Sequence, residues 1–229
     1  QGNAGSGLGL TRNVLHGSVL EALLDGRPMK ELVHPTGLTF LDVVPATPEL
    51  TSAELSLVGA EEPQLRLKQA LAPLRDEYDT ILIDCPPSLG LLTLNALAAA
   101  DAVLVPLQCE YYAMEGLAQL MSTIELAREG LNPELAIDGI VLTMFDPRAN
   151  ISHQVAAEVR RVFPDLVLQT VVPRNVRLAE SPSFGKPVLL YDITSKGAEA
   201  YLSLAQELLK RRKGKLRRKA SGVSERRAR

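Results

Sequence analysis

Asp84 is the side chain of this sequence best placed to do chemistry, because it ends an apolar run and two prolines follow closely. The run from Thr80 to Ile83 is β-branched or aliphatic, which predicts a parallel strand covered on both faces. Proline has no N–H for a sheet, so Pro86 and Pro87 place Asp84 at the carboxyl end of that strand. Ligands of open α/β sheets bind there, and such a carboxylate suits hydrated Mg²⁺ beside phosphates. The alternative is an Asp that caps the next turn, and the spacing alone leaves both open.

The composition predicts a soluble cytoplasmic protein without a disulfide framework. The chain has 229 residues, 46% of them hydrophobic, and two cysteines. Cys85 and Cys109 have no metal-ligand spacing and are expected to be small core residues. No apolar run reaches the length of a membrane span, and the N-terminus lacks a secretory pattern.

The charge is divided unevenly along the chain. Residues 1–209 carry 14 Lys and Arg against 26 Asp and Glu, whereas residues 210–229 carry 11 against 1. We therefore expect one domain over 1–209 and a basic, disordered tail over 210–229. Such a tail can lie along the phosphates of a nucleic acid, or serve only solubility.

Strand-like and helix-like segments alternate, which predicts an α/β fold with a mainly parallel sheet and helices on both faces. The last helix is predicted from Ser195 to about Arg212. The strands are predicted at 38–44, 80–83, 102–106, 137–144, 166–172 and 188–190, and the other helices at 13–24, 64–74, 92–100, 112–129 and 152–163.

Two loops after predicted strands carry further candidates, and parallel strands place them at the same edge as Asp84. Arg148 follows the strand that ends at Met144. Pro173, Asn175 and Arg177 follow the strand that ends at Val172, and the first two have the chemistry to frame a purine base. The arginines suit a phosphate backbone, although surface salt bridges are the simpler interpretation of the sequence alone.

Taken together, these residues resemble the ParA/Soj family of chromosome- and plasmid-partitioning ATPases, relatives of MinD in the deviant-Walker P-loop class. The resemblance extends from the first residue to the end of the last predicted helix. Four blocks carry it: Gln1–Gly9, Tyr78–Asn95, Thr143–Asn150 and Pro173–Asp192.

The resemblance implies ATP and Mg²⁺ as cofactors, an ATP-dependent homodimer that binds DNA without sequence preference, and a ParB-type partner that stimulates hydrolysis. It also implies a nucleoid-associated protein of the cytoplasm. By position, Asp84 matches the acid that holds magnesium through water, and Pro173 with Asn175 matches the adenine-side loop. Arg148 and Arg177 match the family's DNA-contacting arginines.

The sequence departs from the family pattern at its start. It contains no Gly-Lys-Thr or Gly-Lys-Ser, and Gly185-Lys186-Pro187 lacks the hydroxyl and the backbone donor of a phosphate loop. The family's first strand, glycine-rich loop and first helix have no counterpart, so we expect a fragment of a longer protein that does not hydrolyse ATP productively. Strands left without a neighbour would make its fold marginal.

Three other functions remain open at this point. A MinD-like positioning ATPase would act on membranes, although its amphipathic anchor is not matched by this Lys- and Arg-rich end. A non-enzymatic DNA-binding module would use the tail and the two arginines. An iron–sulfur reductase of related fold would need Cys85 and Cys109 at a shared cluster. The sequence does not distinguish a chromosomal from a plasmid system.

Overall fold

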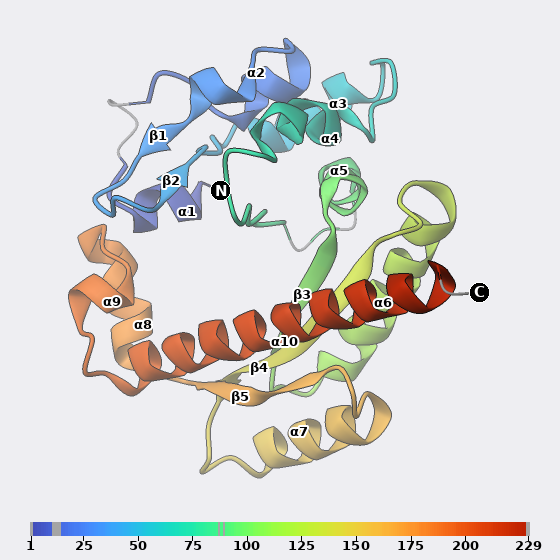
Figure 1. Ribbon diagram of the computed structural model, residues 1–229. Coiled ribbons are helices and arrows are strands. Elements are labelled where there is room, and N and C mark those ends of the chain that lie inside the picture. Colours follow the sequence, from blue (N-terminus) through green and yellow to red (C-terminus); the bar gives the residue numbers. More distant parts are fainter. Residues whose placement is uncertain (1, 11–14, 87, 89, 228–229) are drawn as a thin grey trace. The chain divides into compact units, whose positions relative to one another are not determined.

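The computed structural model describes residues 2–10, 15–86, 88 and 90–227, with the backbone alone at 52, 53 and 214–227 (Figure 1). The chain divides into two compact units. Unit 1 comprises Gln1–Val103, Ala118–Ala136 and Ala179–Tyr191, and unit 2 comprises Leu104–Leu117, Ile137–Leu178 and Asp192–Arg229. Each unit is described by itself.

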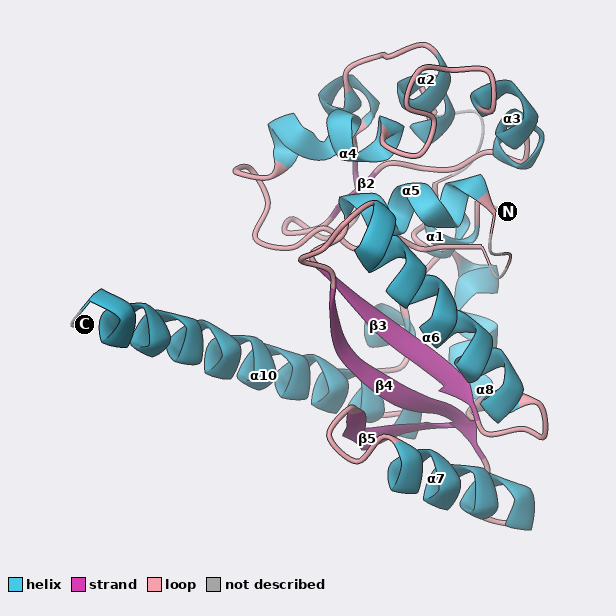
Figure 2. Cartoon of the chain, turned by 90° about the vertical axis from the view of Figure 1, so that its right-hand side faces the viewer, coloured by secondary structure: helices cyan, strands magenta, loops and turns pink. Residues whose placement is uncertain are grey.

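Unit 2 is built on a parallel three-stranded sheet in the order β3–β4–β5 (Figure 2). The strands are β3 (Ala102–Gln108), β4 (Ala136–Phe145) and β5 (Val167–Pro173). All three lie where the sequence predicts strands. Phe145 of β4 is opposite Pro173 of β5, so the loops after these two strands begin side by side.

Helices lie on both faces of this sheet, which confirms the predicted α/β class. Leu204 and Leu208 of α10 (Lys196–Arg227) pack against a buried cluster on β4 and β5, and α7 (Asn150–Val162) lies on the opposite side (Figures 1 and 2). Two further helices, α6 (Ala113–Gly130) and α8 (Val176–Glu180), begin in unit 2. The cluster consists of Val141, Leu168 and Val172 with Leu204.

A bulge in β5 is closed by a carboxylate from α10. Between two paired positions β4 advances from Ile140 to Leu142, while β5 advances from Val167 to Val171. The N–H groups of Gln169 and Thr170 in this bulge donate to the Glu207 carboxylate at 2.8 and 2.9 Å. The Thr170 hydroxyl donates to it as well, at 2.7 Å. Glu207 therefore supplies the acceptors that the irregular strand needs.

Unit 1 is mainly helical and packs around Leu32 and Leu57, whose side chains are fully buried. Asn95 is buried with them, and it accepts from Leu67 N–H at 3.0 Å and donates to Pro63 O at 2.8 Å. Its elements are α1 (Asn3–Gly7), α2 (Val19–Leu24), η2 (Met29–Leu32), β1 (His34–Pro35), β2 (Asp42–Val43), α3 (Leu50–Leu57), α4 (Arg66–Leu71), η3 (Ala72–Leu74), α5 (Leu91–Ala99), η4 (Ser181–Phe184) and α9 (Val188–Tyr191).

The predicted strand from Thr80 to Ile83 is not formed. This segment lies outside both sheets of the described chain, and Leu82 is 85% exposed. A buried parallel strand needs hydrogen-bonded neighbours, and no described strand pairs with this one. Asp84 consequently lies on an exposed segment without regular secondary structure instead of at the end of a covered strand.

Three other predicted elements also differ. The strand over 38–44 shrinks to β2, which pairs antiparallel with β1. The apolar run from Val188 is the helical turn α9, because Leu190 and Tyr191 donate to Pro187 O and proline favours the start of a helix. Helix α2 begins only after Ser18, whose capping box with Glu21 fixes its start, and positions 13–14 lie outside the described residues.

The structure continues α10 through the basic segment to Arg227, where the sequence analysis expected disorder. Lys, Arg, Leu and Ala are strong helix formers, so a helix that starts on the sheet propagates through them. The domain boundary after residue 209 stays a prediction. In the described part of the chain, every helix is too short or too polar to span a lipid bilayer.

We predict that Glu207→Gln lowers the free energy of unfolding by about 1–2 kcal/mol at pH 7, because an amide offers one oxygen where two N–H groups need acceptors. Burial alone would raise the pKa of Glu207, but hydrogen bonds from Gln169 and Thr170 and the charge of Arg211 lower it from 4.5 on balance. The stabilisation is therefore complete above pH 4.5 and is lost as the pH falls through the lower folded-state pKa.

Urea denaturation at pH 7 and at pH 3.5 measures both effects. Glu199→Gln, an exposed change on the same helix, is the matched control and should alter stability little. Equal stabilities of Glu207→Gln and the parent at pH 7 would contradict the assigned role.

Candidate functional site

The connections after β4 and β5 bring three arginines to one edge of unit 2. Phe145 and Pro173 are paired at the ends of these parallel strands, and the Arg174 N–H donates to Phe145 O at 3.0 Å. We call Arg148, Arg174 and Arg177 the arginine edge. Two of them, Arg148 and Arg177, are the residues that the sequence proposes, and their loops leave the sheet at one edge. Asp84, which the sequence places at this edge too, is on no strand of this sheet.

Arg148 forms a bidentate ion pair with Asp146. Its Nε and Nη2 donate to the two carboxylate oxygens at 3.1 and 3.0 Å, and its backbone N–H donates to Oδ1 at 3.0 Å. The hydrogen bond from the Arg148 side chain is the main reason that the pKa of Asp146 falls to about 2. Asp146 is thus ionised at neutral pH, while the Arg148 side chain remains 87% exposed.

Arg177 also has a carboxylate partner. Its Nε lies 3.3 Å from Oδ2 of Asp192, and its backbone N–H donates to Oδ1 of Asn175 at 3.0 Å. Asn175 therefore closes the turn that starts α8. Pro173 is the half-buried last residue of β5. The predicted contact of Pro173 and Asn175 with a purine base stays a prediction.

Sequence reasoning missed Arg174 and the loop after β3. Arg174 lies 3.4 Å from Glu110, which follows the end of β3, and Tyr111 and Tyr112 beside it are 77% and 74% exposed. The two tyrosine rings meet edge to face at 5.1 Å. The signal was available, because Cys109-Glu110-Tyr111-Tyr112 directly follows a predicted parallel strand and must emerge at the same edge.

Asp84 belongs to unit 1, and its predicted role in magnesium binding and catalysis stays a prediction. Its neighbour Cys85 is exposed, so the expectation of a core cysteine is wrong there and confirmed only for the buried Cys109. Desolvation and the Asp84 charge raise the pKa of the Cys85 thiol, which lies 3.7 Å from Ile83 O as a donor. A protonated thiol is a poor metal ligand. Among the residues that the structure describes, no three His, Cys, Asp or Glu side chains are grouped to hold a metal ion.

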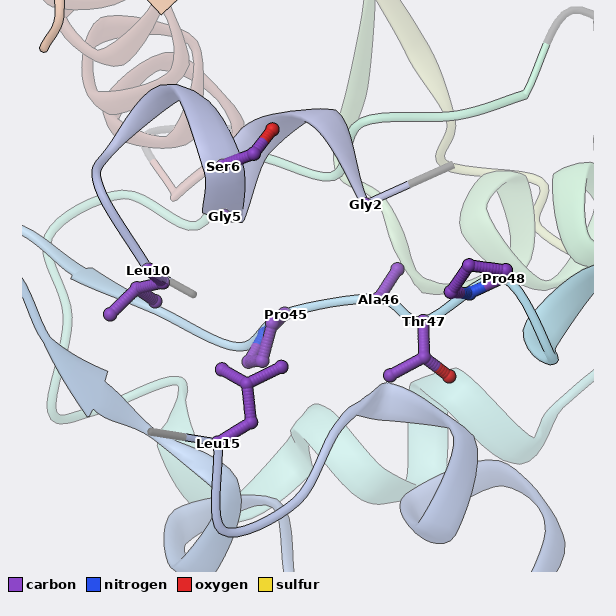
Figure 3. Close-up of a pocket in the computed structure, with 9 residues that line it drawn as sticks. All are labelled: Gly2, Gly5, Ser6, Leu10, Leu15, Pro45, Ala46, Thr47 and Pro48. Atoms are coloured by element: carbon purple, nitrogen blue, oxygen red, sulfur yellow. The ribbon is translucent and has the colours of Figure 1, made fainter. Parts of the chain in front are cut away.

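A pocket of about 160 Å³ lies between the start of the chain and the segment after β2 (Figure 3). Its lining residues carry no charge, and the Ser6 hydroxyl is already donating to Asn3 O at 3.1 Å. This pocket consequently offers little to orient a charged ligand. It is lined by Gly2, Gly5, Ser6, Leu10, Leu15, Pro45, Ala46, Thr47 and Pro48.

Two of the sequence blocks meet in unit 1 through a pair of glycines. Gly9 has a φ of 82° and Gly185 a φ of 61°, both in the left-handed region. A Cβ on Gly185 would lie 2.9 Å from the Gly9 Cα, and one on Gly9 would lie 3.0 Å from Gly185 O. Only glycine allows this backbone conformation and this approach without strain, so the contact explains why both blocks carry a glycine there.

Comparison with known proteins gives relatives over most of the chain. A family model described as an AAA domain matches residues 1–137. The chromosome partitioning protein ParA of Myxococcus xanthus is 64% identical over 211 residues, which are 92% of this chain and 75% of that protein. The sporulation initiation inhibitor protein Soj of Bacillus subtilis is 51% identical over 208 residues, 91% of this chain and 82% of that protein.

A solved structure shares the fold. Cobyrinic acid a,c-diamide synthase from Mycobacterium smegmatis, crystallised with ADP and magnesium, superposes with a TM-score of 0.75 at 36% identity. The match covers 90% of this chain and 76% of that one. The predicted P-loop NTPase-like architecture is thereby confirmed.

We predict that Gly185→Ala lowers the free energy of unfolding by about 2–3 kcal/mol, through a left-handed alanine and a clash with the Gly9 backbone. Gly116→Ala in α6 is the matched control: nothing lies within 4 Å of the position that the new methyl group would occupy, and alanine should stabilise the helix by about 0.5–1 kcal/mol. Thermal melting should show a lower melting temperature for Gly185→Ala and a higher one for Gly116→Ala. An unchanged melting temperature of Gly185→Ala would contradict the close contact with Gly9.

Proposed function

The chain belongs to the ParA/Soj family of chromosome-partitioning ATPases, and on this premise we propose that it segregates a chromosome or plasmid by binding DNA without sequence preference. In this proposal the DNA-binding form is an ATP-dependent homodimer, and a ParB-type partner stimulates hydrolysis and release. The protein would act in the cytoplasm, associated with the nucleoid.

The observation that carries the DNA-binding proposal is the arginine edge. Arg148 and Arg177 lie on adjacent connections at one end of a parallel sheet, with side chains 87% and 51% exposed. Guanidinium groups bind phosphate oxygens in a two-pronged manner, and phosphate contacts carry no base preference. Binding of this kind is sequence-independent and falls steeply with salt.

The cofactor proposal assigns roles to residues of each unit taken separately. A single exposed carboxylate such as Asp84 fits magnesium, which takes one or two carboxylates and keeps several waters. The Asn175 carbonyl oxygen is used by the Arg177 N–H, so its amide N–H groups would face a purine base beside Pro173. Bound Mg²⁺ would neutralise charge on the transferred phosphoryl group. The phosphate cradle has no counterpart in these 229 residues, so residues outside them would have to supply it.

A non-enzymatic DNA-binding module remains the second candidate, because of the basic end of α10. The sequence from Lys215 to Arg229, of which α10 includes the part up to Arg227, carries seven Lys and Arg and one Glu. A MinD-like role on membranes is less well supported, because the basic segment from Lys215 onward has few apolar residues and would insert weakly into lipid.

We predict that Arg148→Ala and Arg177→Ala each weaken binding to a short fluorescein-labelled DNA duplex by about three- to tenfold, uniformly across sequences, and reduce the salt slope by about one. Fluorescence anisotropy measures this in the 229-residue chain and in a version extended by the family's glycine-rich segment, with and without ATP and Mg²⁺. The control is Arg161→Ala on α7, an exposed arginine paired with Glu158. If both edge variants keep the affinity and the salt slope of the parent, the arginine edge is not the DNA-binding face.

The tail is tested by two truncations. Arg211 donates to Asp138 O, Asp165 O and Val167 O, and Arg212 pairs with Asp138 at 3.6 Å, so both belong to the folded unit. We predict that a chain ending at Lys213 keeps its stability and that one ending at Leu209 unfolds more readily. DNA binding that survives Arg148→Ala and Arg177→Ala but vanishes in the chain ending at Lys213 would favour the second candidate.

A further inference from the structure

Every member of the arginine edge has a carboxylate partner in unit 2. The partners come from three segments: the loop after β3, the loop after β4 and the segment before α10. The N–O distances are 3.0, 3.4 and 3.3 Å. The pairs are Arg148–Asp146, Arg174–Glu110 and Arg177–Asp192.

We propose that Arg174 is a third phosphate-binding side chain of this edge, and that Glu110, Asp146 and Asp192 restrain DNA binding by occupying the three guanidinium groups. The inference rests on the proposed function and deepens it. It assigns the affinity for DNA to three carboxylates as well as to three arginines.

The placement of Arg174 supports its part in this face. Its backbone is fixed by the hydrogen bond from its N–H to Phe145 O, so the first residue after β5 lies directly beside the end of β4, whose connection carries Arg148. Its side chain is 55% exposed and contacts Glu110 through a single N–O distance of 3.4 Å. A guanidinium held this loosely exchanges readily to a phosphate oxygen.

The carboxylates oppose DNA for two reasons. Each arginine must give up its partner before it can form a two-pronged contact with phosphate. The displaced carboxylate then stays ionised beside the phosphate at pH 7, because even an unpaired Asp or Glu side chain has a pKa of only about 4. Because exposed ion pairs are weak, DNA phosphates can displace the carboxylates from the arginines. The affinity for DNA is then lower than it would be without the carboxylates.

Amide substitutions remove the charges and leave the turns intact. Oδ1 of Asp146 accepts the Arg148 N–H, and Oδ1 of Asp192 accepts the N–H and the hydroxyl of Thr194 at 3.1 and 2.8 Å. Asparagine keeps an oxygen at both positions. The Glu110 side chain contacts Arg174 and, among the described residues, receives no hydrogen bond from a turn. Glutamine has the same length as glutamate, so Glu110→Gln removes only the charge.

The test measures anisotropy of the same labelled duplex with the ATP-loaded extended protein and with the 229-residue chain. We expect Asp146→Asn, Asp192→Asn and Glu110→Gln each to tighten binding about two- to fivefold, and to steepen the salt slope by up to about one. We expect Arg174→Ala to weaken binding to the same extent as Arg148→Ala. Thermal melting verifies that each variant is folded.

The matched control is Glu158→Gln, which removes one negative charge and leaves Arg161 of α7 without its partner. A gain equal to that of the three edge variants would reduce the effect to net charge and overturn the inference. If the arginine variants lose binding while the amide variants gain none, the restraint is wrong and the proposed function stands. If Arg174→Ala leaves the affinity for the duplex unchanged, Arg174 is not part of the DNA-binding face. If neither the extended protein nor the 229-residue chain binds DNA, the inference and the proposed DNA-binding function are both wrong.

Discussion

The arrangement of unit 2 depends on the pairing of β4 with β5 and on the carboxylate of Glu207 that closes the bulge between them. The bulge leaves two N–H groups of β5 without acceptors on β4, and α10 supplies them. The same helix covers Val141, Leu168 and Val172. Beyond this bulge the pairing of β4 with β5 continues to Phe145 and Pro173, where the connections of the arginine edge begin.

The arginine edge is distinguished by the pairing of each of its arginines with a carboxylate. A row of bare arginines would bind any polyanion, whereas each guanidinium here shares its charge with a neighbouring carboxylate. Exposed pairs of this kind add little to stability, so their place at the loops points to recognition instead of folding. The two exposed tyrosines of the β3 loop lie beside Glu110 on the same surface.

The sequence predicted β3, β4 and β5 well, because each apolar run finds paired neighbours inside the chain. It failed at Thr80–Ile83, where composition indicated a buried strand but no described strand pairs with it. The sequence placed Arg148 and Arg177 after two strands and the structure has them there, while their contact with DNA stays a prediction. Their ion pairs were anticipated only as surface salt bridges without named partners: Asp146 stands two residues before Arg148, whereas only the folded structure brings Asp192 to Arg177.

The closed bulge has a consequence for self-association. An outer strand that bends, and whose spare donors already have acceptors, is a poor template for another chain. The three-stranded sheet of unit 2 therefore has unequal flanks, and β3 is the flank without this protection in the described sheet. The edge that resists strand addition from a second molecule is therefore the one on the β5 side.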